Sequence, residues 1–101
     1  MEYKIDANDA EAVVAVRGRL TFNDHAKLRS LIQEMLQIKA KRQIVDLSNL
    51  EFVDSAGIGM LLIAREELTT AEKTFILRSP QGQVKRVLSV AQLGKIVNIE
   101  E

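Results

Sequence analysis

Residues 46–64 read DLSNLEFVDSAGIGMLLIA, and this stretch joins a predicted central strand to a helix of unusual composition. The short apolar run Gln43–Ser48 is typical of a buried strand. After Asp54, the next ten residues carry no charge. Gly57 and Gly59 both fall inside the helical window, where each glycine costs up to about 1 kcal/mol relative to alanine. A helix under no other constraint would not carry both, so the stretch indicates a special role.

The residues before this stretch predict a hairpin and a helix. Alternating apolar residues mark a strand at 3–7, and a β-branched run at 12–16, ended by Arg17-Gly18, marks its partner. A helix then begins with Asn23 or Asp24 as its N-cap. Its buried face is predicted from apolar spacing at Leu28, Leu31, Ile32, Met35 and Leu36. We expect this helix to end at three cations, which its dipole favours there and which we expect to be solvated: Lys39, Lys41 and Arg42.

The residues after it predict a helix over 56–68, a strand at 74–77, a third helix and a last strand at 96–99. Ser79 suits the N-cap of the third helix, and Pro80 suits its first position, where a missing amide costs nothing. Its apolar residues are Val84, Val87, Leu88 and Ala91, and Gly94 stops it. The order β-β-α-β-α-β-α-β predicts one α/β domain over residues 1–101, with helices packed on a mixed, largely parallel sheet.

Composition excludes several classes of function. Lys+Arg 14 balances Asp+Glu 14, so the chain lacks the positive charge of a general nucleic-acid binder. With no cysteine and one histidine, we expect no disulfide, no thiol nucleophile, no metal site and no cofactor. The amino terminus is polar and no apolar run reaches the length of a membrane span. We therefore expect a cytoplasmic protein, monomeric when free and not inserted in a membrane.

Two interpretations of residues 54–64 remain open at this point. In the first, the helix is buried on several sides and its glycines allow a close approach to the sheet. In the second, an exposed apolar face binds a partner and the glycines make that face flat, because exposed apolar patches on small proteins commonly mark interaction sites.

Ser55 likewise has two possible roles. A serine at a helix start can cap the free amides of the first turn. It can also accept a phosphoryl group, which the amides and the dipole of the helix start favour. Such a group adds a charge of about −1.5 to −2. Repulsion from Asp54 offsets part of this local stabilisation. We expect the fold to tolerate the group, whereas a partner packed against Met60 would not.

The motif at this point resembles a known family. Asp46 to Gly57 fits D-x-S-x-L-x-x-x-D-S-x-G, which is similar to the signature that joins the third strand to the second helix in STAS domains. STAS names the sulfate transporter and anti-sigma factor antagonist family. The segment Gly18–Ala26 resembles the family's loop before the first helix. Without transmembrane helices, the chain looks like a stand-alone bacterial anti-sigma factor antagonist.

The resemblance implies a non-enzymatic, partner-switching regulator. Such antagonists bind an anti-sigma factor, usually a serine kinase of the GHKL type, and so release a sigma factor. The kinase phosphorylates the motif serine, the complex dissociates, and a PP2C-type phosphatase restores it. Carried over to this sequence, Ser55 is the phosphoacceptor and Asp46 a structural, loop-ordering residue. The implied partner-binding residues are Thr21, Asp54, Ala56, Gly57, Ile58, Gly59 and Met60.

Two alternatives belong to other classes. A small enzyme or nucleotide-binding domain could use the helix start at Ser55 to hold phosphate. Against it, the chain has no G-x-x-x-x-G-K-[ST] loop and no G-x-S-x-G elbow, and we expect its one histidine, His25, to be a surface residue. The other alternative is a STAS subunit of a lipid-transport complex that binds its partner without phosphorylation.

Overall fold

A five-stranded sheet frames the structure, a computed structural model that describes residues 1–101. The strands stand in sequence order, with the first pair antiparallel and the other three pairs parallel. This arrangement confirms the predicted mixed, largely parallel sheet. The strands are β1 (Glu2–Ala7), β2 (Glu11–Leu20), β3 (Arg42–Val53), β4 (Thr74–Arg78) and β5 (Asn98–Glu100).

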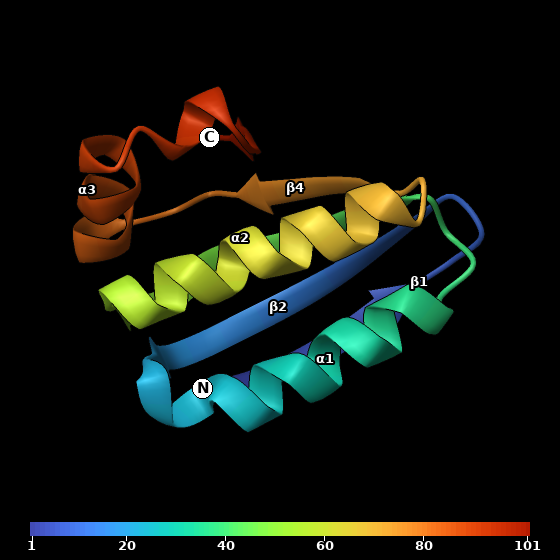
Figure 1. Cartoon of the computed structure of the whole chain (residues 1–101), viewed down its shortest axis with the longest axis horizontal. Coiled ribbons are helices and arrows are strands. Elements are labelled where there is room, and N and C mark those ends of the chain that lie inside the picture. Colours follow the sequence, from blue (N-terminus) through green and yellow to red (C-terminus); the bar gives the residue numbers. More distant parts are fainter.

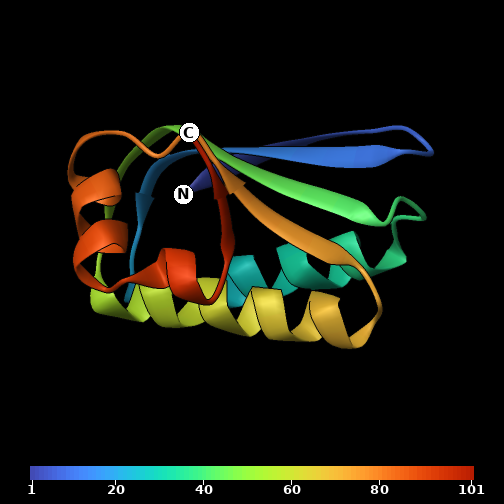
Figure 2. The same ribbon diagram turned by 90° about the horizontal axis from the view of Figure 1, so that it is seen from above.

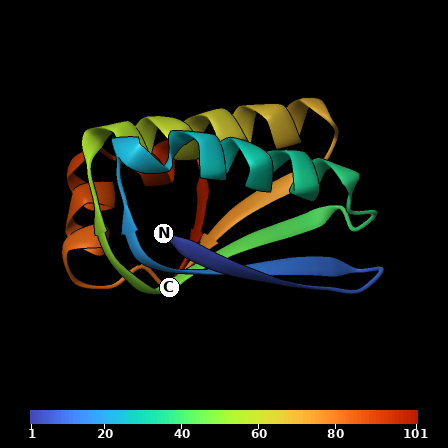
Figure 3. The same cartoon turned by 90° about the horizontal axis from the view of Figure 1, so that it is seen from below.

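Three helices connect these strands: α1 (His25–Gln37), α2 (Ser55–Thr70) and α3 (Gly82–Val90). Helices α1 and α2 lie side by side over one face of the sheet (Figures 1 and 3). Helix α3 lies at the end of the molecule where α2 begins (Figure 2). Short 3-10 turns, η1 (Phe22–Asp24) and η2 (Leu93–Lys95), precede α1 and follow α3. No helix in the structure combines the length and the apolar character needed to span a bilayer.

The core fills the space between the sheet and the helices. The α1 residues Leu28, Leu31, Ile32 and Met35 are buried as predicted, while Leu36 is half-buried. From α3, Val84 and Leu88 enter the same cluster, Val87 packs against it and Ala91 is exposed. The spacing of apolar residues therefore identified the buried face of α1, and that of α3 except at Ala91, which lies beyond the end of the helix.

The opposite face of the sheet carries no helix, yet it still buries two isoleucines. Ile44 and Ile76 alternate with core residues of their strands, and they are 0% and 2% exposed. Charged side chains flank them: the Arg42 guanidinium lies 3.3 Å from Glu11 Oε2 and 2.7 Å from Glu100 Oε2. Arg78 lies 3.3 Å from Glu100 Oε1. Glu100 of the last strand is therefore tied to its neighbour β4 through Arg78 and to β3, one strand further in, through Arg42.

This network predicts a pH dependence of stability. The hydrogen bond from Arg42, with a second from Arg78, lowers the pKa of Glu100 below its ordinary value. A carboxylate whose pKa is lower in the folded state stabilises the fold above its unfolded pKa, and that stabilisation is lost as pH falls through the folded pKa. We expect Glu100→Gln to unfold at lower urea than the parent protein at neutral pH, with the difference vanishing in acid. A difference that stays constant with pH would contradict this assignment.

The two central strands extend further than predicted. We expected β2 to end at Arg17-Gly18, but it continues to Leu20 because Gly18 adopts a positive φ of 88°, which glycine tolerates without strain. The β2–β3 register shifts beside Gly18 and again beside Ala15, so that pairing resumes beyond each irregularity. β3 likewise runs without a break through the expected turn to Val53.

The end of α1 also differs from the prediction. The helix stops at Gln37, so Lys39, Lys41 and Arg42 lie beyond it, and Arg42 already belongs to β3. The cation at this helix end comes instead from a distant position. Lys73 Nζ donates to the carbonyl oxygens of Ile38, at 2.7 Å, and Ala40, at 3.3 Å. A long-range contact thus fills the role assigned to the neighbouring lysines.

The C-terminal boundaries are shifted by a few residues. Gln81, rather than Ser79, precedes α3 as its N-cap, because Ser79 adopts a left-handed φ of 55°. Helix α3 ends at Val90, and Gly94 lies in η2 instead of terminating the helix directly. The last strand covers Asn98–Glu100 rather than 96–99, because the amides of Ile96 and Val97 donate to the Leu93 carbonyl of η2 and so do not pair with β4.

Candidate functional site

Asp54 joins three elements at the start of α2. Its Oδ1 accepts a 2.7 Å hydrogen bond from the Gly57 amide, which makes Asp54 the N-cap of the helix. Its Oδ2 accepts from the Phe22 amide of η1 at 3.2 Å, and its own amide donates to the Leu20 carbonyl at 3.2 Å. Capping therefore belongs to Asp54 and not to Ser55. The same side chain also fixes η1 against the start of α2.

Ser55 is the first residue of α2 and is exposed. Its hydroxyl forms no hydrogen bond within the protein. The hydroxyl stands beside the free amides of the first turn, where a negative group is favoured by the helix dipole. Because Asp54 already supplies the cap, the Ser55 hydroxyl is chemically available at the surface.

The two glycines of α2 do different things. A Cβ on Gly57 would lie 2.6 Å from the Leu20 carbonyl oxygen and 2.6 Å from Val53 Cγ2, so this residue sits directly against the sheet. A Cβ on Gly59 would meet nothing within 4 Å. The close approach to the sheet is therefore confirmed at Gly57, whereas Gly59 faces open space, as a binding face would require.

Three of the residues expected to contact a partner are buried. Gly57 faces the sheet, and Ile58 and Met60 are only 9% and 6% exposed because both belong to the core cluster. The expectation that these side chains are presented on the surface is wrong in this structure. Helical periodicity explains why: at about 100° per residue, Gly57 and Met60 fall on the arc opposite Ser55, with the buried Leu61, Ala64 and Leu68, and Ile58 lies at the edge of that arc.

The surface around Ser55 is instead built from two elements. Ser55, Ala56, Gly59 and Ile63 follow one another along the outer side of α2, and Ile63 is 48% exposed. Thr21 and Phe22 lie beside them at η1. We call these six residues the Ser55 surface: Thr21, Phe22, Ser55, Ala56, Gly59 and Ile63.

Phe22 is the member of the Ser55 surface that sequence reasoning missed. Its side chain is 72% exposed, although an aromatic ring normally gains stability from burial. The available signal was a large apolar residue in a segment between strand and helix, next to Thr21. Its backbone amide is held by Asp54, which directly precedes Ser55, so the backbone of Phe22 is fixed next to the start of α2.

Thr21 has a local structural contact. Its amide and hydroxyl donate to Asp24 Oδ2 at 2.9 and 3.4 Å, and the Met1 ammonium group lies 3.1 Å from Asp24 Oδ1. Burial alone would raise the pKa of Asp24, but the hydrogen bonds from Thr21 and the Met1 ammonium outweigh burial and lower it. An ionised Asp24 therefore orders the η1 turn that carries Phe22.

Asp46 shapes the strand before the site. Its Oδ1 accepts a 2.9 Å hydrogen bond from the Ser48 amide. The β2–β3 register shifts between Asp46 and Asn49, so this contact orders the backbone where pairing is irregular. The geometry agrees with the structural role that the resemblance implied for Asp46.

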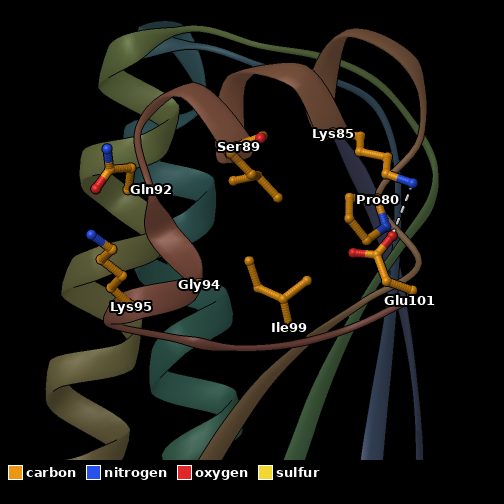
Figure 4. A pocket seen from close by; sticks show the side chains of 9 residues that line it. Pro80, Lys85, Ser89, Gln92, Gly94, Lys95, Ile99 and Glu101 are labelled. Carbon is orange, nitrogen blue, oxygen red and sulfur yellow. Dashed lines mark ion pairs between the residues drawn. The ribbon is translucent and has the colours of Figure 1, made fainter.

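Two hollows lie on other parts of the surface. His25 is exposed, as predicted, and lines a shallow hollow between α1 and α2. No group of three or more His, Cys, Asp or Glu side chains gathers into a potential metal site. An open hollow of about 390 Å³ lies between α3 and the C-terminal residues, where Lys85 forms a 3.0 Å ion pair with Glu101 (Figure 4). None of the predicted site residues lines that hollow.

Comparison with known proteins places this geometry in a family. The family model described as the Mlab, STAS domain matches residues 3–98. A STAS-domain containing protein of Pseudomonas aeruginosa is 27% identical over 92% of this chain and 91% of its own length. A candidate anti-sigma factor antagonist of Thermotoga maritima is 30% identical over 76% of this chain and 68% of its own length.

Solved structures show the same fold. The anti-sigma factor antagonist SpoIIAA in its unphosphorylated form superposes with a TM-score of 0.79 at 22% identity, covering 99% of this chain and 89% of SpoIIAA. The phosphorylated form of the Bacillus SpoIIAA superposes with a TM-score of 0.72, covering 99% and 92% of the two chains at 22% identity. Because the family model matches residues 3–98 of the 101, the chain belongs to the STAS domain family.

Proposed function

We propose that this protein is an anti-sigma factor antagonist controlled by phosphorylation of Ser55. The observation that carries the proposal is the exposed, unbonded Ser55 hydroxyl at the start of a helix that Asp54 already caps. The unphosphorylated form binds an anti-sigma factor, a serine kinase of the GHKL type, in the cytoplasm and so releases a sigma factor. The protein acts by binding and catalyses no reaction itself.

The arrangement of the Ser55 surface supports a switch by charge. A phosphoryl group on Ser55 adds a charge of about −1.5 to −2 next to Phe22, Ala56 and Gly59. These neighbours carry no positive charge that could pair with it. A partner seated on the Ser55 surface would bury that charge without compensation, so phosphorylation releases the partner. A PP2C-type phosphatase then restores binding.

The comparisons support this proposal. The Thermotoga maritima relative is named as a candidate antagonist of an anti-sigma factor, and SpoIIAA is described in an unphosphorylated and a phosphorylated form. The motif serine and its preceding aspartate are present in this chain as Asp54-Ser55.

A second candidate function is a subunit of a lipid-transport complex. In that case the same surface holds its partner permanently and Ser55 is never modified. The exposed side chains of Phe22 and Ile63 support this candidate as well as they support the first one, because apolar side chains suit a lasting interface. The presence or absence of phosphate on Ser55 separates the two functions.

Intact mass of the protein purified from its native host tests the proposal. We expect a species heavier by about 80 Da, the mass of one added phosphoryl group. It should vanish in Ser55→Ala and persist in Ser30→Ala, which removes an exposed hydroxyl on α1. Unmodified protein under every growth condition would contradict the proposal and favour permanent partner binding.

A further inference from the structure

The end of β3 lacks a strand partner on one side. Strand β4 pairs only with Arg42–Asp46, the first part of β3, while β2 accompanies β3 to Val53 on the other side. The Asp54 amide donates towards β2, to the Leu20 carbonyl. The N–H and C=O of Val53, one residue earlier, therefore point to the open side, because these groups alternate in direction along a strand.

A single side chain satisfies both of these groups. Gln83 Oε1 accepts from the Val53 amide at 3.0 Å, and Gln83 Nε2 donates to the Val53 carbonyl at 3.0 Å. Val53 is 1% exposed, so its backbone groups would otherwise be buried without partners, which is costly. The amide of Gln83 thus replaces one residue of a neighbouring strand at this point.

We propose that Gln83 is a positioning residue for Ser55. This inference rests on the proposed function for its biological meaning, but its structural content stands by itself. Val53 directly precedes Asp54, whose carboxylate holds both Phe22 and Gly57. Gln83 fixes the chain immediately before that carboxylate, and so it fixes the places of Ser55 and of the Phe22 backbone together.

Helix α3 gives Gln83 a rigid base. Gln83 is the second residue of α3, and the next residue, Val84, is 0% exposed in the core. The helix lies at the end of the molecule where α2 begins (Figure 2). Gln83 therefore connects the packing of α3 to the Ser55 surface. None of the six residues of that surface belongs to α3.

Amide hydrogen exchange tests this role in two variants. Gln83→Met keeps the shape of the side chain but removes both hydrogen bonds. We expect protection of the Val53 and Gly57 amides to fall about tenfold or more, since each lost hydrogen bond shifts an equilibrium several-fold. The Val13 and Ala15 amides, which face β1 in the antiparallel β1–β2 pair, serve as references and should keep their protection. Equal loss at all four amides would mean a general structural role and would overturn the proposal.

Gln83→Glu adds a signature that packing cannot imitate. Its carboxylate can accept from the Val53 amide but repels the Val53 carbonyl. A protonated carboxyl offers one donor and one acceptor, like the original amide. Relative to the parent protein at the same pH, we expect low protection of Val53 at neutral pH and recovery at about pH 4, near the ordinary glutamate pKa. Absence of recovery would overturn the proposal, and this comparison decides it even where Gln83→Met does not fold.

The fraction of Ser55 phosphorylated in the native host supplies the functional readout. We expect it to fall in Gln83→Met while the amount of folded protein stays the same. An unchanged fraction would overturn the link to phosphorylation. If the parent protein itself carries no phosphate, the proposed function fails, and the exchange data still decide the positioning role of Gln83.

Discussion

Replacing Gly57 with alanine is expected to destabilise the fold by about 2–3 kcal/mol, even though alanine is the better helix former. The added Cβ would lie 2.6 Å from the Leu20 carbonyl oxygen and 2.6 Å from Val53 Cγ2. The first of these atoms is backbone, so the clash can be relieved only by moving α2 away from the sheet. For a domain of about 100 residues, this loss corresponds to a fall in Tm of roughly 10–20 °C.

Gly59→Ala is the matched control on the same helix. A Cβ there meets nothing within 4 Å, so only helix propensity changes. We expect a stabilisation of about 0.5–1 kcal/mol. Thermal and urea unfolding of the two variants measure both effects. Similar changes in the two variants would contradict the assignment of Gly57 to close packing.

Phosphorylation of Ser55 is expected to weaken binding of the anti-sigma factor by about 30- to 3,000-fold, because an unpaired charge buried at an interface costs about 2–5 kcal/mol. The effect needs no change of fold: Ser55 is exposed, and the residues beneath it are already packed in the core. Amide NMR spectra of the two forms should therefore superimpose except near Ser55. Shifts across the whole sheet would contradict a switch based on local charge.

Titration of the anti-sigma factor recovered with the chain from its host measures this effect. Ser55→Asp should reproduce part of the loss, since it adds one negative charge at the same place. Thr70→Asp is the control: it adds the same charge to an exposed position at the far end of α2. The two sites are roughly 22 Å apart along the helix. Equal weakening by both variants would point to a general charge effect and not to the Ser55 surface.

Local patterns in the sequence predicted the fold well. The apolar spacing of α1 identified its buried face, and the order of strands and helices gave the mixed sheet. The D-x-S-x-L-x-x-x-D-S-x-G spacing pointed to the family that the comparisons show. These features depend on neighbours within a few residues, which is the range that a sequence pattern describes.

The details of the candidate site depended on contacts over long distances in the chain. Nothing near Ser55 in sequence indicates that Phe22 stands beside it, because an Asp54 hydrogen bond across 32 residues creates that proximity. The burial of Ile58 and Met60 likewise follows from the packing of α2 on the sheet. A motif names residues that stand together in sequence, and in a helix those residues point in different directions.

The division of α2 into a packed side and an open side has a consequence for related proteins that share one cell. Gly57, Ile58 and Met60 hold the helix to the sheet, whereas Ala56 and Ile63 belong to the outer surface. Gene copies can therefore exchange outer residues, together with Phe22, without loss of folding. Such exchanges would let duplicated STAS domains acquire separate partners, while the buried half of the motif stays unchanged.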